Sequence, residues 1–299
     1  MTFVYCCDVC TIVDIMRKLR VEDSYFPSKN SIRFGENLFS LAVPKVMGII
    51  NCTPDSFYEG SRYETIKGIL TQTEKFISEG VDIIDIGGYS TRPGSFNIPL
   101  TEEIERTQHA IASIRKEFPE ILISIDTFRS QVALEALEAG ANLVNDISGG
   151  EIDPEIWNVV AKYKCPYILM HMRGTPQSMQ DFTTYDSLFK DIASYFSTKI
   201  NTLKKLGIHD VIIDPGFGFS KTLEQNDELL NTLSDLQFLG CPILVGFSRK
   251  SMIYKKLGIT AQEALNGTTI LNTKAILNGA KILRVHDVKE AKEVVELLS

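Results

Sequence analysis

A short stretch near residue 50 joins an apolar run to a group of oxygen-bearing side chains. The sequence MGIINCTPDSF, residues 47–57, runs through apolar residues to Asn51 and becomes polar at Thr53, Asp55 and Ser56. An amide, hydroxyls and a carboxylate therefore follow one strand-like segment. Each of these groups can bind a ligand through hydrogen bonds, so the stretch predicts a binding site at a strand end.

Seven further apolar runs also lead into polar or glycine-rich residues. They end at Gly87, Asp126, Asn145, Met170, Asp214, Ser248 and Arg284, and Arg92 and His286 follow shortly after two of them. One aspartate behind a strand often only caps the next helix. Capping is a poor explanation for Asn51, Arg92, Lys250, Arg284 and His286. We therefore interpret the whole series as the rim of one site.

One part of this rim is cationic. It contains Arg92, Lys250, Arg284 and His286, with the hydroxyl groups of Thr91 and Ser251 beside them. Such a cluster suits an anion with several oxygens, such as a phosphate or pyrophosphate. These charges could instead be solvated surface residues. Arg284, however, stands inside the apolar run Ile-Leu-Arg-Val, where an unpaired guanidinium would be costly.

The other part of the rim is neutral or acidic. Asp126, Asn145 and Asp214 can accept hydrogen bonds from the ring N–H and amino groups of a fused heterocycle. Met170 and Phe219 could supply flat apolar contacts, although both are also credible core residues. The two chemistries together predict a ligand with a flat polar ring and an anionic group.

Four familiar kinds of site are rejected, each because a required residue or spacing is missing. GFGFSKT, residues 216–222, lacks the glycine that a phosphate-binding loop places before Lys-Thr. Lys250 replaces the second glycine of a nucleophile elbow in residues 246–250. The four histidines show no metal-ligand spacing, and Cys6, Cys7 and Cys10 lack the fourth ligand that structural zinc usually has.

Eight strand-like runs alternate with helix-period stretches from residue 46 onward. The predicted strands are 46–51, 82–87, 121–126, 142–146, 166–171, 210–214, 242–246 and 281–284, and the clearest helices are 101–117, 131–139 and 187–206. Glycines at 80, 140, 207, 240 and 279 are predicted to end helices. Eight such units favour a closed (β/α)8 TIM barrel, whose site lies at the carboxyl ends of the strands.

The residues before the barrel follow a different pattern. Two short apolar runs in residues 31–43 flank Gly35-Glu36-Asn37 and predict a β-hairpin at the barrel bottom. Residues 30–299 then form a single domain, and residues 1–29 form an N-terminal extension of unknown role.

A net charge of −7 argues against nonspecific binding to nucleic acid or an anionic membrane. The absence of an apolar span or leader pattern makes a cytoplasmic enzyme the default.

The motifs jointly resemble dihydropteroate synthase, a family of the pterin-binding enzyme superfamily. The resemblance covers residues 44–299 and rests on MGIINCTPDSF, DIGGYSTRPG (85–94), SIDT (124–127), NDIS (145–148), DPGFGF (214–219), SRKS (248–251) and RVHD (284–287). It implies a transferase of folate biosynthesis. The reaction condenses 6-hydroxymethyl-7,8-dihydropterin pyrophosphate with 4-aminobenzoate to give 7,8-dihydropteroate and pyrophosphate.

The resemblance also implies a role for each matching residue. The residues that would hold the pterin are Asp126, Asn145, Asp214 and Lys250, and its pocket would be lined by Met170 and Phe219. Asn51 would bind Mg²⁺, and the diphosphate would be bound by Arg284 and His286. The residues that would surround 4-aminobenzoate are Phe57, Thr91, Pro93, Phe219, Lys250 and Ser251. Arg92, Asp126, Lys250 and Asp55 would be the catalytic group. Loops 53–62 and 89–97 would close over the site. A homodimer and sensitivity to sulfonamides are implied as well.

A dissociative substitution assisted by Mg²⁺ follows from these roles. The departing pyrophosphate needs Mg²⁺ and fixed cations, while Asp126 can offset the positive charge left on the pterin. The Asp55 loop would exclude water as a competing nucleophile.

The chain departs from the family pattern at Tyr89, Cys52, Glu59 and Ser220. Two other readings of the chain stay open. One is a corrinoid methyltransferase of the same superfamily, and the other is a non-catalytic pterin-binding paralogue.

Overall fold

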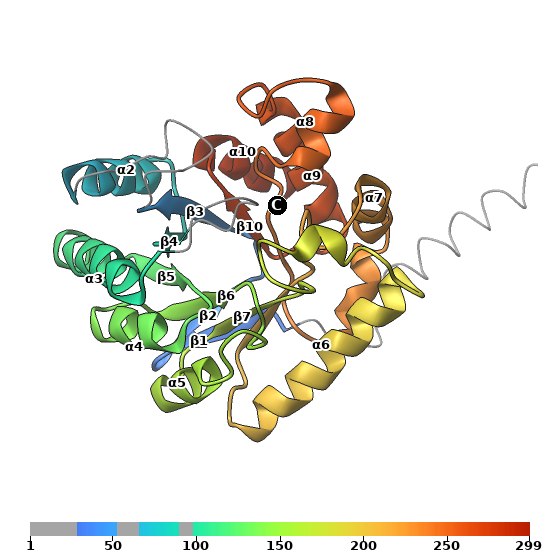
Figure 1. Cartoon of the computed structure of the whole chain (residues 1–299). Helices are drawn as coiled ribbons and strands as arrows, with labels where there is room; N and C mark the ends of the chain where they lie inside the picture. Colours follow the sequence, from blue (N-terminus) through green and yellow to red (C-terminus); the bar gives the residue numbers. More distant parts are fainter. Residues whose placement is uncertain (1–28, 53–65, 90–97) are drawn as a thin grey trace, which may run out of the picture.

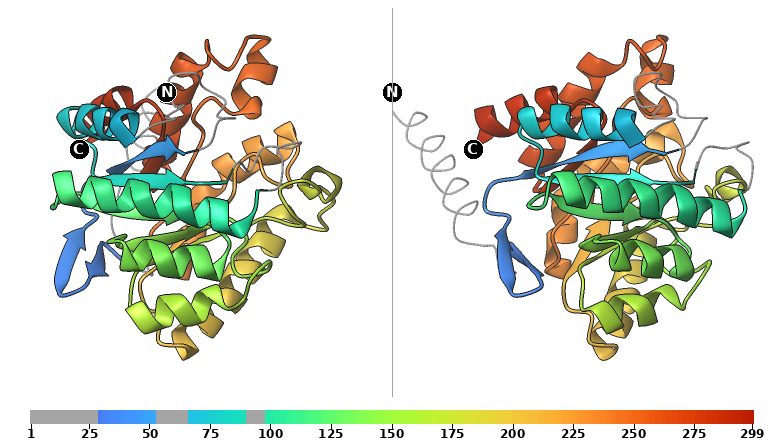
Figure 2. Two further views of the ribbon diagram at one scale, coloured as in Figure 1. Left: turned by 60° about the vertical axis from the view of Figure 1, so that its left-hand side comes forward. Right: turned by 90° about the vertical axis from the view of Figure 1, so that its left-hand side faces the viewer.

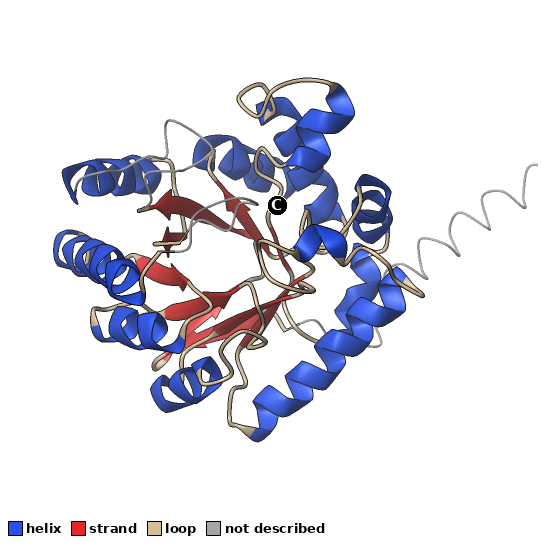
Figure 3. Cartoon of the chain, in the orientation of Figure 1, coloured by secondary structure: helices blue, strands red, loops and turns tan. Residues whose placement is uncertain are grey.

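Eight parallel strands form a barrel, and the helices surround it (Figures 1 and 3). The computed structural model describes residues 29–52, 66–89 and 98–299. The strands are β3 (Lys45–Asn51), β4 (Ile83–Gly87), β5 (Leu122–Asp126), β6 (Leu143–Asp146), β7 (Tyr167–Met170), β8 (Val211–Asp214), β9 (Leu244–Val245) and β10 (Ile282–Val285). They pair in the order β8-β7-β6-β5-β4-β3-β10-β9, and a bridge from Ile213 to Ile243 brings β8 next to the β9 segment. The predicted barrel is thereby confirmed.

The helices lie between the strands in sequence. They are α2 (Ile66–Ser78), α3 (Leu100–Glu117), α4 (Ser130–Glu138), α5 (Ile156–Tyr163), α6 (Leu188–Lys205), α7 (Leu223–Asn231), α8 (Ser251–Leu257), α9 (Leu265–Leu277) and α10 (Val288–Leu298), with 3-10 turns at Met179–Asp181 and Leu233–Leu239. All five glycines predicted to end helices have positive φ, as at Gly140 with φ 113°. The predicted seventh strand was too long, because only Leu244 and Val245 make regular pairs.

Each barrel strand has two faces with different partners. The outward residues, such as Val46, Ile84 and Ile125, belong to one large core cluster with the surrounding helices. The inward residues near the strand starts form a second apolar cluster that includes Met47, Ile83 and Leu143. Two residues further along several of these strands, the inward position is polar. These polar residues include Asp85 on β4, Asn145 on β6 and Asp214 on β8. A strand with period two therefore keeps its outer face largely apolar, while its inner face changes from apolar to polar along the strand.

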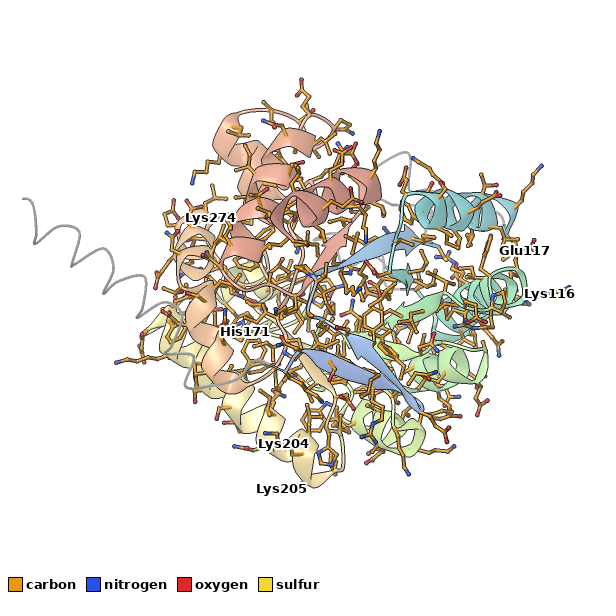
Figure 4. All side chains as sticks on the ribbon, turned by 180° about the vertical axis from the view of Figure 1, so that it is seen from behind. Lys116, Glu117, His171, Lys204, Lys205 and Lys274 are labelled. Atoms are coloured by element: carbon orange, nitrogen blue, oxygen red, sulfur yellow. The ribbon has the colours of Figure 1, made fainter. Side chains whose placement is uncertain are left out.

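A β-hairpin closes the amino-terminal end of the barrel (Figures 2 and 4). It consists of β1 (Ser31–Phe34) and β2 (Asn37–Ser40), and Gly35 has φ 59° in the turn. Ile32, Phe34 and Leu41 are buried in the inward apolar cluster. Burial of each such side chain contributes about 1.5–3 kcal/mol. The predicted plug at the barrel bottom is confirmed, and residues 1–28 of the predicted extension lie outside the described residues.

Candidate active site

Four residues form one polar layer where strands β3 to β6 end. The register pairs Asn51 with Gly87, Gly87 with Asp126, and Asp126 with Asn145. Neighbouring partners in a sheet point to the same face, so Asn51, Asp126 and Asn145 all point into the barrel. The structure thus brings together three of the residues that the sequence predicted for the site.

Gly87 leaves room between two of these side chains. A Cβ atom at Gly87 would lie 3.2 Å from Asn51 Oδ1 and 3.8 Å from Asp126 Oδ2. An amide oxygen and a carboxylate oxygen therefore face one small space that a larger residue would fill. Neutral and anionic oxygens are the ligands that Mg²⁺ takes in proteins. The donor set at this position fits the predicted magnesium ligand Asn51.

Arg284 reaches into this layer from the opposite side of β3. Its Nη2 donates a hydrogen bond to Asp126 Oδ2 at 2.5 Å, and its Nε donates to Asp85 Oδ2 at 2.6 Å. Burial lowers the pKa of Arg284, but the carboxylates of Asp85 and Asp126 outweigh it and raise that pKa above its ordinary value. The guanidinium is therefore a permanent cation held inside the barrel, as its place in an apolar run predicted.

Asp85 is a site residue that the sequence analysis assigned no role. It is fully buried on β4, and Asn145 Nδ2 also donates to its Oδ2, at 3.1 Å. The sequence does contain a pattern that could have identified Asp85. This residue interrupts the apolar run Ile-Ile-Asp-Ile in the same way that Arg284 interrupts the run Ile-Leu-Arg-Val. Two opposite charges in separate apolar strands are candidates for pairing.

Asp214 and Lys250 form a second pair of oppositely charged groups in the site, after Asp126 and Arg284. Asp214 Oδ1 accepts a hydrogen bond from the backbone N–H of Gly216 at 2.8 Å. Lys250 Nζ donates to the carbonyl oxygen of Phe217 at 2.7 Å and lies 4.8 Å from the centre of the Phe219 ring. Gly246 contributes no side chain there, and a Cβ atom would lie 3.9 Å from Lys250 Nζ. Lys250 and Phe219 are thus brought together as predicted.

Burial shifts the protonation of these groups. Burial raises the pKa of Asp126, and the adjacent Arg284 lowers it in part. Burial raises the pKa of Asp214, whereas Lys250 lowers it. Burial lowers the pKa of Lys250 to about 8, and Asp214 opposes that change. The site therefore holds titratable groups of both signs whose charges depend on one another.

An apolar group lies beside the polar layer. Met170, Phe128, Tyr89 and Ile147 are buried together, and Phe219 packs against this cluster. The Tyr89 ring packs edge-on against Phe128 with centroids 5.2 Å apart, and the Tyr89 hydroxyl accepts a hydrogen bond from Gln177 Nε2 at 3.0 Å. Met170 and Phe219 thus lie together at the edge of the site. Tyr89, a departure from the family pattern, is an integral part of this cluster.

His286 and Ser251 follow the last two strands. His286 Nδ1 lies 3.0 Å from Ser248 Oγ, and its backbone N–H donates to the same oxygen. A cavity of about 280 Å³ lies beside His286, where α2 contributes Lys75 and α10 contributes Lys289. Ser251 is the first residue of α8, directly after Lys250. Arg249 differs from these residues because it forms an ion pair with Asp287 at 2.9 Å.

His171 and Asp146 are polar residues at strand ends that face away from the barrel axis. His171 is buried against Tyr195 and Phe196, well inside the outline of the molecule in Figure 4, where Lys204 and Lys205 lie at the periphery. Lys221 Nζ lies 3.1 Å from His171 Nδ1 and donates to the carbonyl oxygens of Gly216 and Phe219. Burial lowers the pKa of Lys221 to about 7. This buried group supports the loop that carries Phe219.

Several predicted residues cannot be placed. Asp55, Phe57, Glu59, Thr91, Arg92 and Pro93 lie outside the described residues, as do Cys6, Cys7 and Cys10. The described cysteines Cys52, Cys165 and Cys241 are buried free thiols. Across residues 29–52, 66–89 and 98–299, no group of three His, Cys, Asp or Glu side chains could hold a metal ion.

Comparison with known proteins identifies relatives of the whole barrel. Residues 47–286 match the family described as pterin binding enzyme. A dihydropteroate synthase of Synechocystis sp. is 44% identical over 286 residues, covering 94% of this chain and 98% of the relative. The crystal structure of Yersinia pestis dihydropteroate synthase with a sulfonamide drug has a TM-score of 0.85 at 37% identity, covering 90% and 97% of the two chains. The Xanthomonas albilineans enzyme with 4-aminobenzoic acid has a TM-score of 0.82 at 33% identity, covering 90% and 97%.

Proposed function

The chain belongs to the dihydropteroate synthase family of pterin-binding enzymes, and on this premise we propose how its site works. It is a transferase of folate synthesis that joins 6-hydroxymethyl-7,8-dihydropterin pyrophosphate to 4-aminobenzoate. The observation that carries the mechanism is the position of Arg284 between Asp85 and Asp126, with Lys250 and Asp214 nearby. A fixed cation therefore lies directly beside a carboxylate in the same site.

The ring of the pterin is bound by the acceptor groups. Asp214 and Asn145 accept from the amino and ring N–H groups, and their burial makes each hydrogen bond costly to lose. Met170 and Phe219 contact the flat faces of the ring. Lys250 donates to a ring acceptor, and its ammonium lies 4.8 Å from the centre of the Phe219 ring, on the side of the site that the pterin would occupy. These contacts orient the exocyclic methylene carbon of the pterin toward Asp126 and Arg284.

The bond to pyrophosphate then breaks before the new bond is complete. The methylene C–O bond cleaves with its electron pair leaving on the pyrophosphate, whose charge Arg284 and His286 stabilise. The Asp126 carboxylate offsets the cation left on the pterin methylene. The amine nitrogen of 4-aminobenzoate attacks that carbon and afterwards loses one proton to solvent. Because an aniline nitrogen is only weakly basic, no strong base is needed.

Asn51 would hold Mg²⁺ through its amide oxygen, in the space that Gly87 leaves open. Bound Mg²⁺ would neutralise charge on the phosphate oxygens of the substrate. Few protein ligands are consistent with an ion that keeps waters and substrate oxygens in its shell. Asp55 and Arg92 would act from the loops that follow β3 and β4.

A pyrophosphate-release assay tests the function. Purified protein is titrated calorimetrically with the pterin pyrophosphate, 4-aminobenzoate is added, and released pyrophosphate and dihydropteroate are measured. We expect release only when both substrates and Mg²⁺ are present. Methyl transfer to a corrinoid would favour the rival methyltransferase, and binding without release would favour a non-catalytic paralogue. Arg284 and His286, the residues proposed to bind the diphosphate, argue against the methyltransferase, which needs no diphosphate site.

We also infer a cytoplasmic location and sensitivity to sulfonamides. The described cysteines are free and buried, which agrees with a reducing compartment. No helix in the described part of the chain is long and apolar enough to cross a membrane. The Yersinia pestis relative binds a sulfonamide drug, and a compound of that class should compete with 4-aminobenzoate here.

We further propose a homodimer that uses α9. Ile270 and Leu277 lie seven residues apart on this helix and are 58% and 69% exposed. Residues at that spacing share one face of a helix, and the neighbouring α8 adds Leu257, which is also exposed. Light scattering should give twice the chain mass, and Ile270→Lys should shift it toward the monomer. Leu38→Lys, at an equally exposed leucine in the distant hairpin, is the control.

A further inference from the structure

Asp85 is the only carboxylate in the described residues that contacts both halves of the site. Its Oδ2 accepts from Arg284 Nε at 2.6 Å and from Asn145 Nδ2 at 3.1 Å. Asn145 belongs to the pterin end, and Arg284 belongs to the pyrophosphate end. One buried oxygen atom therefore connects the two ends of the substrate site.

The burial of Asp85 makes this connection rigid. Asp85 is fully inaccessible to solvent, whereas the side chain of Asp126 keeps 14% of its area exposed. In the register, Asp85 pairs with Ile49 on one side and Ser124 on the other, below the layer of Gly87 and Asp126. A charge-assisted hydrogen bond in such a place is short and directional. Arg284 is thus anchored from below at Nε.

The two contacts of Arg284 differ in what they leave free. Nε faces the buried Asp85, while Nη2 faces Asp126 at the open end of the barrel. Phosphate oxygens can therefore compete with Asp126 for Nη2 without releasing the guanidinium from Asp85. The exchange would leave the Asp126 carboxylate available to the pterin cation.

We propose that Asp85 is a positioning residue for the transfer reaction, which holds Arg284 for the pyrophosphate and Asn145 for the pterin through one carboxylate. This role rests on the proposed function. It explains how the pterin end and the pyrophosphate end of the substrate site are held in a fixed relative position. Asp85 touches no substrate in this scheme. Its effect passes entirely through Arg284 and Asn145.

The unpartnered atoms beside Asp85 agree with this role. Within the described residues, Asp85 Oδ1 and Ser124 Oγ are buried and have no hydrogen-bond partner. Leaving a buried acceptor unsatisfied is costly, so stability alone is a poor reason for placing a carboxylate here. The charge serves the guanidinium and the amide that contact its other oxygen.

The test compares Asp85→Asn with Asp146→Asn. Asp146 is an equally buried aspartate on β6 that faces outward and accepts from Ser148, Gly150 and Tyr167. Each variant is titrated calorimetrically with 6-hydroxymethyl-7,8-dihydropterin and with its pyrophosphate. For Asp85→Asn we expect the affinity advantage of the pyrophosphate form to fall roughly tenfold or more. For Asp146→Asn the ratio should stay at the wild-type value.

Steady-state kinetics provides a second readout. Asp85→Asn should lower kcat/KM by about 100-fold, the effect of misplacing a reacting group by about 1 Å. In an Arg284→Gln background, Asp85→Asn should add much less to the loss, because the part of its effect that passes through Arg284 is already removed. Additive losses, or an unchanged affinity ratio in a folded Asp85→Asn protein, would overturn the proposal.

Arg284→Lys covers the case in which Asp85→Asn does not fold. A lysine has one compact ammonium in place of the separate Nε and Nη2 donors of the guanidinium, so the same selective loss for the pyrophosphate form is expected. A wild-type affinity ratio in Arg284→Lys would contradict the proposal. Turnover of the wild-type protein distinguishes a failure of the proposed function from a failure of the proposed role of Asp85. If the wild-type protein releases no pyrophosphate, the proposed function fails; if it does and the ratio is unchanged, only the role of Asp85 fails.

Discussion

Arg284 and Asp126 meet across the interior of the barrel although their strands are not neighbours. Two strands, β3 and β4, separate β10 from β5, yet Arg284 Nη2 lies 2.5 Å from Asp126 Oδ2. In the proposed mechanism, this contact places a cation for the leaving pyrophosphate beside an anion for the pterin left behind. A loose transition state would need both signs of charge close together, and this pair would supply them before substrate binds.

Removal of Arg284 should cost stability in a pH-dependent way. Arg284→Met leaves Asp85 and Asp126 without their cation, and breaking such a buried pair typically costs about 3–5 kcal/mol. The pKa of Asp126 is already raised by burial and would rise further without Arg284. Protonation at low pH would then relieve the repulsion, so the loss should be smaller at pH 5 than at pH 8. Urea unfolding at both pH values measures this, and an equal loss at both would contradict it.

Deprotonation of Lys250 should make the pH profile of kcat/KM fall on its alkaline side. Burial lowers its pKa to about 8, so kcat/KM for the pterin pyrophosphate should fall as the pH rises through about 8. Lys250→Arg keeps its charge at that pH and should lose this limb, even if its rate is lower. A limb that persists unchanged in Lys250→Arg would assign it to another group.

The same lysine should affect stability with the opposite sign. Between about pH 8 and 10.5 the unfolded chain keeps a proton on Lys250 that the folded chain has lost. The free energy of unfolding should therefore rise with pH across this window because of Lys250. Denaturant unfolding of the wild type and Lys250→Met should differ in slope there, with the rise reduced in the variant.

Gly87→Ala should raise the magnesium requirement. Its Cβ would lie 3.2 Å from Asn51 Oδ1 and would displace that amide. We expect the Mg²⁺ concentration for half-maximal activity to increase roughly tenfold. Gly246→Ala, whose Cβ would meet only atoms at 3.6 Å or more, should leave that concentration unchanged. The same shift in both variants would mean that the effect is not local to Asn51.

Gly48→Ala should destabilise the barrel without altering the site. The new Cβ would lie 2.7 Å from the Phe76 ring and 3.1 Å from Val288, where α2 and α10 pack on the outside of β3. Overpacking of this kind costs about 1–3 kcal/mol. Thermal unfolding should show the loss, kcat should be retained, and Phe76→Leu should restore part of the stability. A normal stability in the single variant would show that the helices can move apart.

Arg92→Ala should abolish turnover and leave pterin binding largely intact. Arg92 follows β4 in the motif YSTRPG and lies outside the described residues. Its predicted role is in the closing loop rather than at the pterin ring. Calorimetry with the pterin pyrophosphate, together with kcat, separates these effects. An unimpaired kcat would remove Arg92 from the catalytic group.

The fold class and much of the candidate site could be predicted from the amino-acid sequence. Alternation of apolar runs with helix-period stretches identified the barrel, because such runs can be buried only in a parallel sheet covered by helices. Glycines at helix ends identified the strand starts. Since the strands of a barrel end on one side, Asp126, Asn145, Asp214 and Arg284 could be assigned to a common rim.

The direction in which each polar residue faces, and its partner across the barrel, depend on how the barrel closes. Asn145 and Asp146 are adjacent polar residues at one strand end, and nothing local to them shows which points to the axis. Closure of the barrel sets the register, which turns Asn145 toward Asp85 and Asp146 toward Tyr167. The same closure brings Arg284 to Asp85 across 199 positions of sequence. Contacts of that range depend on strand stagger, and stagger is a property of the assembled sheet.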